Sequence, residues 1–310
     1  MNDRMLATCH EDETAGRAGV LPATADELLV MDPVEVFRLL DRPERFEELS
    51  EEVLAQLAAI AIGAFGMLRL QELGPKIVPL YEAYARRVPD EVRHALAGNI
   101  RDSAAAGEMT PMALFPFFLL EPETHIVAMA ALDMAVLSPI EGGDPLTGPR
   151  HLLEIFRDRG AKNRAGIFAG LLLLGDRRVT RLLWDVRDEL TRDEMRTVAE
   201  SQSGCVWAAT VEFWLDWLEG LPGDAEDWRF GLVAWALAQI PGAMRVPEVL
   251  DGERLFPVTA DLAEPIRNLR RSPFGEFAPA VLRRLRTVER REPEPKVLPL
   301  VIGAWDAVAG

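Results

Sequence analysis

Residues Ala165–Asp176 read AGIFAGLLLLGD, and residues Arg177–Leu190 continue as RRVTRLLWDVRDEL. The first run consists of small and large apolar residues and ends in Gly-Asp, a dipeptide typical of tight turns. In the second run Val179, Leu182 and Leu183 are spaced as on one face of a helix. The stretch therefore predicts a helix, a tight turn and a second helix.

A similar pattern recurs along the chain. Four segments each begin with polar residues, continue as a helix rich in Ala, Leu, Val and Ile, and end at a turn: 121–137, 160–176, 203–220 and 227–242. The second segment starts 39 residues after the first, and the third starts 43 residues after the second. These spacings are close to the period of about 40–47 residues that is typical of helix-pair repeats. In these features the chain resembles HEAT-like (armadillo/HEAT-type) repeat proteins, over about residues 50–242. The resemblance implies an α-α superhelix, a solenoid of helix pairs whose extended face usually binds macromolecules.

The rest of the chain also favours helices. Leu and Ala, both strong helix formers, are abundant, and alternating runs of β-branched residues are almost absent. We therefore predict an all-α fold. Residues 1–23 are expected to form a flexible polar tail, and residues 24–310 a single helical-repeat domain. Helices that cap the solenoid are expected within about 260–310, with a final pair at roughly 273–291 and 297–308. The turn-rich stretch 139–149 is expected to be a loop.

The charge limits the classes of partner. The 310 residues include 34 Lys and Arg against 50 Asp and Glu, a formal net charge of −16. Nucleic-acid binders usually carry a positive surface, so this acidic chain favours a partner with a basic surface instead. The two cysteines form no metal-binding pattern, and the acidic N-terminus lacks the features of a secretion signal. The longest apolar stretch, 53–68, is too short to span a bilayer, so we expect a cytoplasmic protein without a membrane partner.

Four tryptophans are candidates for a binding surface. Trp207, Trp214 and Trp217 are expected on one side of a single helix, and Trp184 is near them in the sequence. Tryptophan dominates binding hot spots, so these side chains could form an aromatic wall for a ligand or peptide. Aromatic residues at helical spacing also commonly form the core between stacked helices, and the sequence leaves both interpretations open.

A second candidate is the basic segment 157–164. Within an acidic chain, it concentrates Arg157, Arg159, Lys162 and Arg164. The segment falls between the end of one predicted helix and the start of the next, and a helix N-terminus flanked by arginines can hold an anion. Salt bridges between repeats are the alternative role for these residues.

Three carboxylates share one side of the helix that carries the tryptophans. Glu212, Asp216 and Glu219 follow one another at spacings of four and three residues, which places them on one helical face. They could bind a cation or a basic peptide, or they could form the solvated face of an amphipathic helix.

The sequence contains no HExxH or GxSxG signature and no glycine-rich cofactor fingerprint. We therefore expect no catalytic residue, metal or cofactor, and a non-enzymatic scaffold or adaptor that binds a protein or peptide. One alternative is an enzyme, since Trp184-Asp185 is similar to the aromatic-plus-carboxylate site of DNA glycosylases built from HEAT-like repeats. The net charge argues against it, and such an enzyme would need an arginine-lined concavity around the tryptophans. Another alternative is an acidic immunity or regulatory protein.

Overall fold

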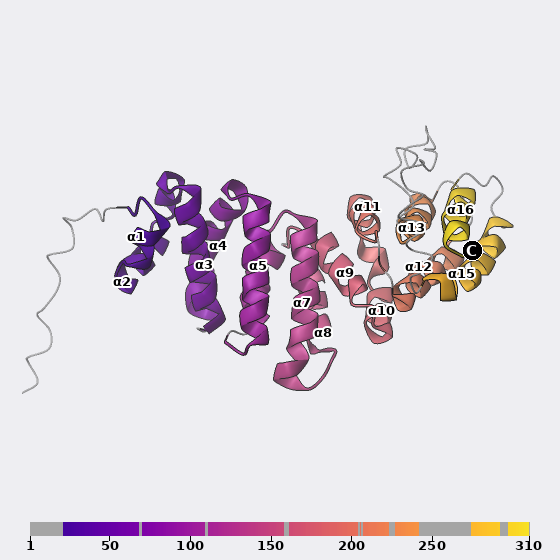
Figure 1. Ribbon diagram of the computed structural model, residues 1–310, viewed down its shortest axis with the longest axis horizontal. Helices are drawn as coiled ribbons and strands as arrows, with labels where there is room; N and C mark the ends of the chain where they lie inside the picture. The colour runs from indigo at the N-terminus through magenta and orange to yellow at the C-terminus, as the bar shows by residue number, and fades with distance from the viewer. Residues whose placement is uncertain are drawn as a thin grey trace, which may run out of the picture. The chain divides into compact units, whose positions relative to one another are not determined.

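The computed structural model describes residues 21–67, 70–108, 111–157, 161–203, 205, 207–222, 227–241, 274–291 and 297–309. Every regular element within these ranges is an α-helix or a 3-10 helix, which confirms the predicted all-α fold (Figure 1). None of the helices described there has the length and apolar character that crossing a bilayer requires. Residues 1–20 of the expected tail and residues 260–273 of the expected cap lie outside the described residues. The HEAT-like superhelix remains a prediction.

The chain divides into two compact units, Met1–Leu96 and Ala97–Gly310, and helix α5 (Asp90–Ala105) contains the boundary. The other described elements of the first unit are α1 (Ala25–Leu29), α2 (Pro33–Leu40), η1 (Pro43–Glu48), α3 (Glu51–Met67) and α4 (Leu70–Arg87). Those of the second unit are η2 (Pro111–Leu114), α6 (Phe115–Leu120), α7 (Thr124–Gly142), α8 (Thr147–Arg157), α9 (Arg164–Leu173), α10 (Arg177–Trp184), η3 (Arg187–Glu189), α11 (Arg192–Glu200), α12 (Ala208–Gly220), α13 (Trp228–Gln239), α15 (Phe274–Glu289) and α16 (Leu298–Ala309).

Side-chain caps and backbone contacts order the first unit. The Thr24 hydroxyl accepts a hydrogen bond from the backbone N–H of Glu27 at 3.2 Å, and the Glu27 carboxylate accepts one from the N–H of Ala23 at 2.7 Å. The Thr24 side chain thus caps the start of α1, and Glu27 connects the preceding residue to the helix. Helix α3 packs along α4, and Arg87 at the end of α4 donates a hydrogen bond to the carbonyl oxygen of Phe46 at 2.7 Å. The end of α4 is thereby fastened to η1.

In the second unit, α9 packs closely along α7 because two of its residues are glycines. A Cβ atom at Gly170 would lie 2.3 Å from the carbonyl oxygen of Ala128, and one at Gly166 would lie 2.6 Å from Cβ of Val127. Both distances are far below van der Waals contact, so neither position has room for a side chain. The small residues in AGIFAGLLLLGD thus let two helix backbones approach each other.

The first part of the predicted helix–turn–helix at 165–190 has the expected form. After α9 comes a turn in which Gly175 has a φ of +65°, a conformation that favours glycine. Asp176 then caps α10 by accepting a hydrogen bond from the N–H of Arg178 at 2.7 Å. The second helix is shorter than expected, because the backbone after Trp184 forms i→i+3 hydrogen bonds and continues as η3.

The prediction of a loop over 139–149 is wrong, because the observed connection is shorter. Helix α7 continues to Gly142 and α8 begins at Thr147, so only residues 143–146 connect them. A proline deprives a helix of one hydrogen bond, and here this is not enough to end α7. The helix ends before Gly143, whose φ of +71° is typical of the residue that follows a helix.

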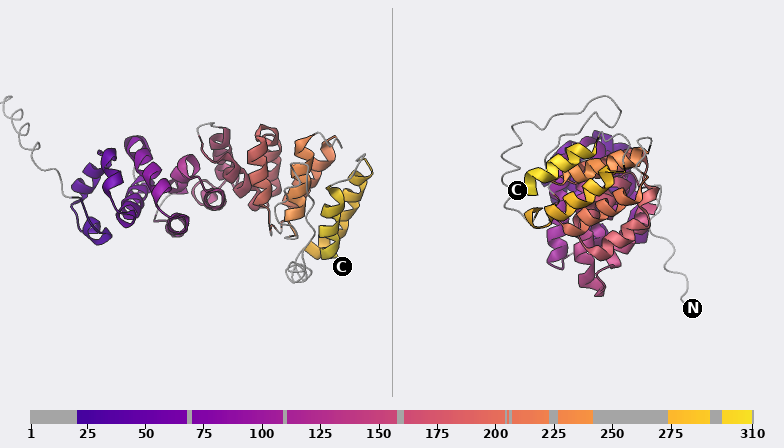
Figure 2. Two further views of the ribbon diagram at one scale, coloured as in Figure 1. Left: turned by 90° about the horizontal axis from the view of Figure 1, so that it is seen from above. Right: turned by 90° about the vertical axis from the view of Figure 1, so that its right-hand side faces the viewer.

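The predicted final pair of helices is present as α15 and α16. They lie side by side (yellow in Figure 2), and α16 also contacts α13. The buried Trp305 of α16 donates a hydrogen bond from Nε1 to the carbonyl oxygen of Leu237 in α13 at 2.9 Å. This bond and the burial of the indole fix the last helix against α13.

Candidate functional site

A groove lies between α10 and α12. Each helix lines it with residues at positions i, i+3, i+4 and i+7, which share one helical face. The lining residues are Arg177, Thr180, Arg181 and Trp184 of α10 and Ala209, Glu212, Phe213 and Asp216 of α12. The groove encloses about 340 Å³. Its buried lining residues are Thr180, Ala209 and Phe213, so the groove has a floor of small and aromatic side chains.

Three of the four charged side chains in the groove are paired within the protein. Arg177 Nη2 lies 2.8 Å from Glu212 Oε1. Asp216 Oδ1 accepts a hydrogen bond from Nη2 of Arg284, in α15, at 2.6 Å. Arg181 is exposed and makes no hydrogen bond or ion pair with its side chain within the part of the chain that the structure describes. Among the described residues, the groove therefore has one charge without a partner, and this charge is positive.

Arg284 also binds Glu219, which lies beyond the groove on α12. Its Nε and Nη2 are 2.6 and 2.8 Å from the two carboxylate oxygens of Glu219. These hydrogen bonds lower the pKa of Glu219 and raise the pKa of Arg284. The hydrogen bond between Arg284 and Asp216 raises the pKa of Arg284 further. All three carboxylates on this side of α12 are thus neutralised by arginines of the same chain, Glu212 by Arg177 and the other two by Arg284.

Trp184 forms an aromatic wall of the groove and is held by two neighbours. Its ring meets Phe213 edge-on, with ring centroids 5.9 Å apart. The guanidinium carbon of Arg187 lies 3.9 Å from the centroid of the indole, and Arg187 also donates a hydrogen bond to the carbonyl oxygen of Trp184. Arg187 is not among the residues that line the groove, whereas Trp184 is. The stack and the hydrogen bond together order the indole.

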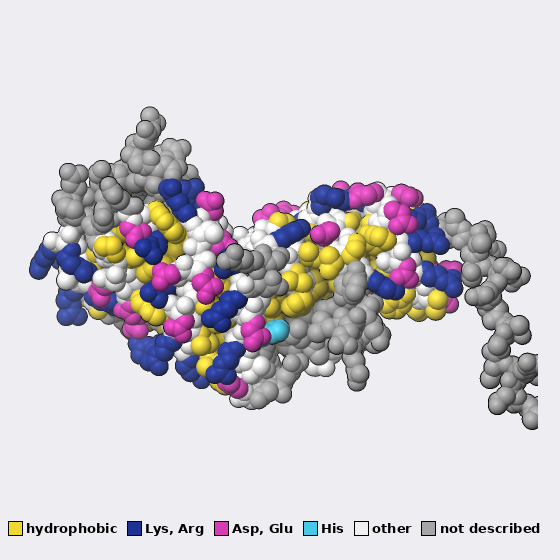
Figure 3. Space-filling model, turned by 180° about the vertical axis from the view of Figure 1, so that it is seen from behind, with side chains coloured by type: hydrophobic (Ala, Val, Ile, Leu, Met, Phe, Trp, Pro, Cys, Tyr) yellow, Lys and Arg dark blue, Asp and Glu magenta, His cyan; other side chains and the backbone are white. Residues whose placement is uncertain are grey.

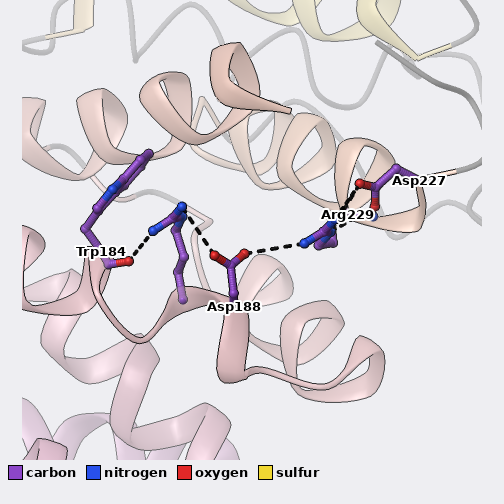
Figure 4. A network of polar contacts seen from close by, with 5 residues as sticks. Trp184, Asp188, Asp227 and Arg229 are labelled. Carbon is purple, nitrogen blue, oxygen red and sulfur yellow. Dashed lines mark hydrogen bonds and ion pairs between the residues drawn. The ribbon is translucent and has the colours of Figure 1, made fainter. Parts of the chain in front are cut away.

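A network of ion pairs continues from Arg187 to the start of α13 (Figure 4). Arg187 Nη2 lies 3.3 Å from Asp188 Oδ2, and Asp188 Oδ1 lies 3.5 Å from Arg229 Nη1. Arg229 also binds Asp227, the N-cap residue of α13, through two nitrogens at 3.0 and 2.8 Å, which lowers the pKa of Asp227. The segment that follows Trp184 is therefore tied to a second helix.

Trp214 and Trp217, two of the candidate surface residues, are buried in the core. Their rings stack at a centroid distance of 5.6 Å and an interplanar angle of 8°. Trp214 Nε1 donates a hydrogen bond to Oε1 of the buried Gln202 at 3.3 Å. Neither tryptophan lines the groove. These two side chains therefore belong to the core between stacked helices, which was one of the two roles that the sequence left open.

Trp207 remains on the surface, with 51% of its area exposed. It is the residue before α12 and not part of that helix, which corrects the prediction of three tryptophans on one helix. A Cβ atom at Gly175 would lie 2.3 Å from Cγ of Trp207, so the indole rests on the turn that precedes α10. Trp207 is therefore situated where α10 and α12 both begin.

Arg164, from the basic segment 157–164, has a structural role. Its guanidinium carbon lies 4.3 Å from the ring centroid of Phe156, and its Nη1 is 3.1 Å from Glu194 Oε1. Only 14% of the side chain is exposed. These contacts connect α8, α9 and α11, and they leave little of the guanidinium for an anion.

The other residues of the basic segment lie away from the groove or outside the described residues. Arg157, at the end of α8, is exposed and has Nε 3.8 Å from Glu189 Oε1. Lys162 is exposed just before α9, and Arg159 lies outside the described residues. Neither Arg157 nor Lys162 lines the groove, so the structure does not bring the basic segment and the tryptophans together there.

Sequence reasoning missed Arg177, Arg181 and Phe213. The signal that could have found the two arginines is their spacing of four and three residues along α10 with Trp184, which places all three on one face. Phe213 could not be assigned in this way, because it depends on which helix packs against α10.

The groove has the aromatic and charged lining of a binding site. Among the described residues, its side chains do not form a recognisable set of catalytic groups. Over those same residues, no group of three or more His, Cys, Asp and Glu side chains is placed to hold a metal ion. Comparison with protein-family models, with curated proteins and with solved structures finds no match for the chain. The function must therefore be argued from the groove itself.

Proposed function

We propose that the chain is a non-enzymatic scaffold that holds a protein partner by a short peptide segment in the groove between α10 and α12. The observation that carries this proposal is Trp184, ordered by Arg187 and Phe213 on the wall of an open groove. Tryptophan dominates binding hot spots, and a side chain that is already ordered loses little conformational entropy when a ligand binds.

The dimensions of the groove suit a segment of a few residues. From Arg177 to Trp184 the helix rises by about 10 Å, a distance that an extended peptide covers in about three residues. The enclosed volume of about 340 Å³ is near the lower end of the range of about 300–1,000 Å³ found for ligand pockets. A whole folded domain would contact the surrounding surface and insert only such a segment.

The charge of the chain supports a partner whose surface is basic as a whole. A formal charge of −16 attracts a basic protein at long range and speeds association at low ionic strength. An acidic immunity or regulatory protein would be one form of this scaffold, since it too would bind a basic partner. A location in the cytoplasm belongs to the same proposal.

The groove fits a DNA glycosylase less well than it fits a peptide-binding scaffold. Its charged residues are two arginines and two carboxylates, whereas a DNA duplex requires a concavity lined by positive charge. Asp185 is exposed at the end of α10 and does not join Trp184 in lining the groove. Basic and acidic side chains are also intermixed over the described part of the face in Figure 3. We therefore favour the scaffold.

A photo-crosslinker in the groove tests the proposal. p-Benzoylphenylalanine is introduced at Arg177, whose side chain is 69% exposed, and in a matched control at Arg283, which is exposed on α15. Irradiation of the source cells should give a protein adduct from position 177 and none from position 283. The partner, once purified, should bind the full chain stoichiometrically and bind the Trp184→Ala variant about tenfold more weakly or worse.

Three results would contradict the scaffold. They are no adduct at position 177, equal adducts at both positions, and a purified partner whose affinity is unchanged by Trp184→Ala. Thermal unfolding of each variant shows whether the chain still folds, so that a loss of binding is not mistaken for a loss of structure.

A further inference from the structure

We infer that the partner's segment presents a carboxylate to Arg181 and, two residues away, an apolar or aromatic side chain to Trp184. This inference rests on the proposed function and adds the chemistry of the bound segment. It starts from the distribution of charge in the groove, where every charged side chain except Arg181 has a partner among the residues that the structure describes.

The unpaired charge selects an anionic group. Glu212 and Asp216 are neutralised by arginines at 2.8 and 2.6 Å, so a basic side chain in the groove would have to displace one of those arginines. The exposed guanidinium of Arg181 has no such competitor among the described side chains, and a guanidinium matches a carboxylate through two parallel hydrogen bonds. The groove is therefore complementary to a carboxylate.

The spacing of the two lining residues sets the spacing in the ligand. Arg181 and Trp184 are three residues apart on one helical face, which places their Cβ atoms about 5–6 Å apart. In an extended peptide, side chains two residues apart point to the same side and are separated by about 6–7 Å. A carboxylate and an apolar side chain at positions i and i+2 can thus reach Arg181 and Trp184 together.

The apolar side chain has a matching surface. Ala209 and Phe213 are buried in the floor of the groove, and Phe213 meets the Trp184 ring edge-on. Arg187 stacks on the indole without lining the groove, so a ligand side chain meets the part of Trp184 that does line it. Burial of an aromatic side chain against such a floor is the usual source of affinity in a small pocket.

An acidic residue in the segment is compatible with a partner that is basic as a whole. Exposed charges are screened beyond about 8 Å at physiological ionic strength. The net charge of −16 acts on the whole surface of the partner during approach, whereas Arg181 acts on one carboxylate at contact. The two effects can be separated by using short peptides, which carry the segment without the rest of the partner.

Synthetic hexapeptides provide the probe. They are acetylated and amidated, carry a fluorophore, have Phe at the third position and Glu, Gln or Lys at the fifth, and have Ala or Gly elsewhere. A shorter set ends at the residue after Phe with a free carboxylate, which offers the same group from a chain terminus. Fluorescence anisotropy with the full chain should show that the Glu peptide, or the peptide with the free terminus, binds about tenfold more tightly than the Gln peptide. The Lys peptide should bind no more tightly than the Gln peptide.

Charge reversal of the arginine gives the decisive comparison. Arg181→Glu should abolish the preference for Glu and transfer it to Lys, whereas the matched variant Arg283→Glu should leave the wild-type order unchanged. Trp184→Ala should weaken binding of all the peptides. Because Arg181 and Arg283 are both exposed, both variants are expected to keep the wild-type thermal unfolding midpoint.

Equal binding of the Glu and Gln peptides, or a preference for Glu that persists in Arg181→Glu, would overturn the inference. If Trp184→Ala still weakens binding in that case, the groove remains a peptide site and only the role of Arg181 falls. If no peptide of either set binds the wild-type chain, the inference also fails, and the crosslink from position 177 decides separately whether the groove holds a protein partner.

Discussion

Helices α7 and α9 and helices α10 and α12 are two helix pairs of the same unit that pack differently. The first pair is in close backbone contact, whereas a groove lies between the members of the second pair. In the first pair Gly166 and Gly170 face α7 and leave no space for a Cβ atom. In the second pair α10 lines the groove with the long side chains of Arg177, Arg181 and Trp184. Arg177 contacts Glu212 of α12 and Trp184 contacts Phe213 of α12. The size of the residues on one helical face thus determines whether that face becomes core or site.

The difference separates stability from binding. The contact between α7 and α9 is made by buried backbone and apolar atoms, whose loss is costly. The pair formed by Arg177 and Glu212 in the groove is well exposed, and such pairs contribute little to stability. Substitutions in the first pair should therefore act on unfolding, and substitutions in the second pair should act mainly on binding.

The largest effect is expected for Gly170→Leu. Its side chain would meet the backbone of α7, since even a Cβ atom would lie 2.3 Å from the carbonyl oxygen of Ala128. The free energy of unfolding should fall by about 3 kcal/mol or more in urea denaturation. As a control, a Cβ atom at Gly98 in α5 meets nothing within 4 Å, so Gly98→Ala should be neutral or stabilise by up to about 1 kcal/mol. Equal effects of the two variants would refute the role of close approach.

Trp184→Ala should have an intermediate effect on stability. It removes the stack with Arg187 and the edge contact with Phe213, which together are worth about 1–2 kcal/mol. Trp184→Phe keeps an aromatic ring for both contacts and should cost less than half as much. Urea denaturation of the two variants checks this order. A cost for Trp184→Ala as large as that of Gly170→Leu would mean that the groove is part of the core.

Arg284→Gln should reduce stability by about 1 kcal/mol at pH 7, because its partner Glu219 is partly screened by solvent. Arg284 lowers the pKa of Glu219 in the folded chain. The stabilisation is therefore present above the ordinary glutamate pKa of about 4.3 and is lost as the pH falls through the lower folded value. The difference between wild type and variant should shrink in denaturation experiments below about pH 4. A difference that stays constant over this range would argue against the ion pair as its cause.

The smallest effect is expected for the exposed pair in the groove. Arg177→Ala and Glu212→Ala should each change the free energy of unfolding by less than about 0.5 kcal/mol. A double-mutant cycle should give a coupling of a few tenths of a kcal/mol that decreases as salt is added. A coupling above about 1 kcal/mol would show that the groove contributes to stability after all.

Local pattern was enough to predict several elements. The apolar run before Gly175 predicted α9 and its turn, and the C-terminal helices α15 and α16 were found close to where they were expected. The length of α10 was not predictable in this way, because the 3-10 turns after Trp184 accompany a contact of Arg187 with the indole. Such a contact is not visible in helical spacing.

The candidate site was less predictable than the fold, and the tryptophans show why. Trp184 and Trp214 both lie in helices with amphipathic spacing, yet one lines a groove and the other is fully buried. Helical spacing assigns a residue to a face, but only the packing of helices decides what covers that face. For the same reason the sequence left open whether Arg164 binds an anion or forms a salt bridge between helices, since its partner Glu194 comes from α11.

The most direct test of the groove is an NMR titration of the full chain labelled with ¹⁵N-tryptophan. The hexapeptide with Phe and Glu is added to saturation, and the indole signals are assigned with single Trp→Phe variants. The indole signal of Trp184 should shift, while those of the buried Trp214 and Trp235 should stay in place. An unchanged Trp184 signal at saturation, or equal shifts of the buried indoles, would contradict a peptide site between α10 and α12.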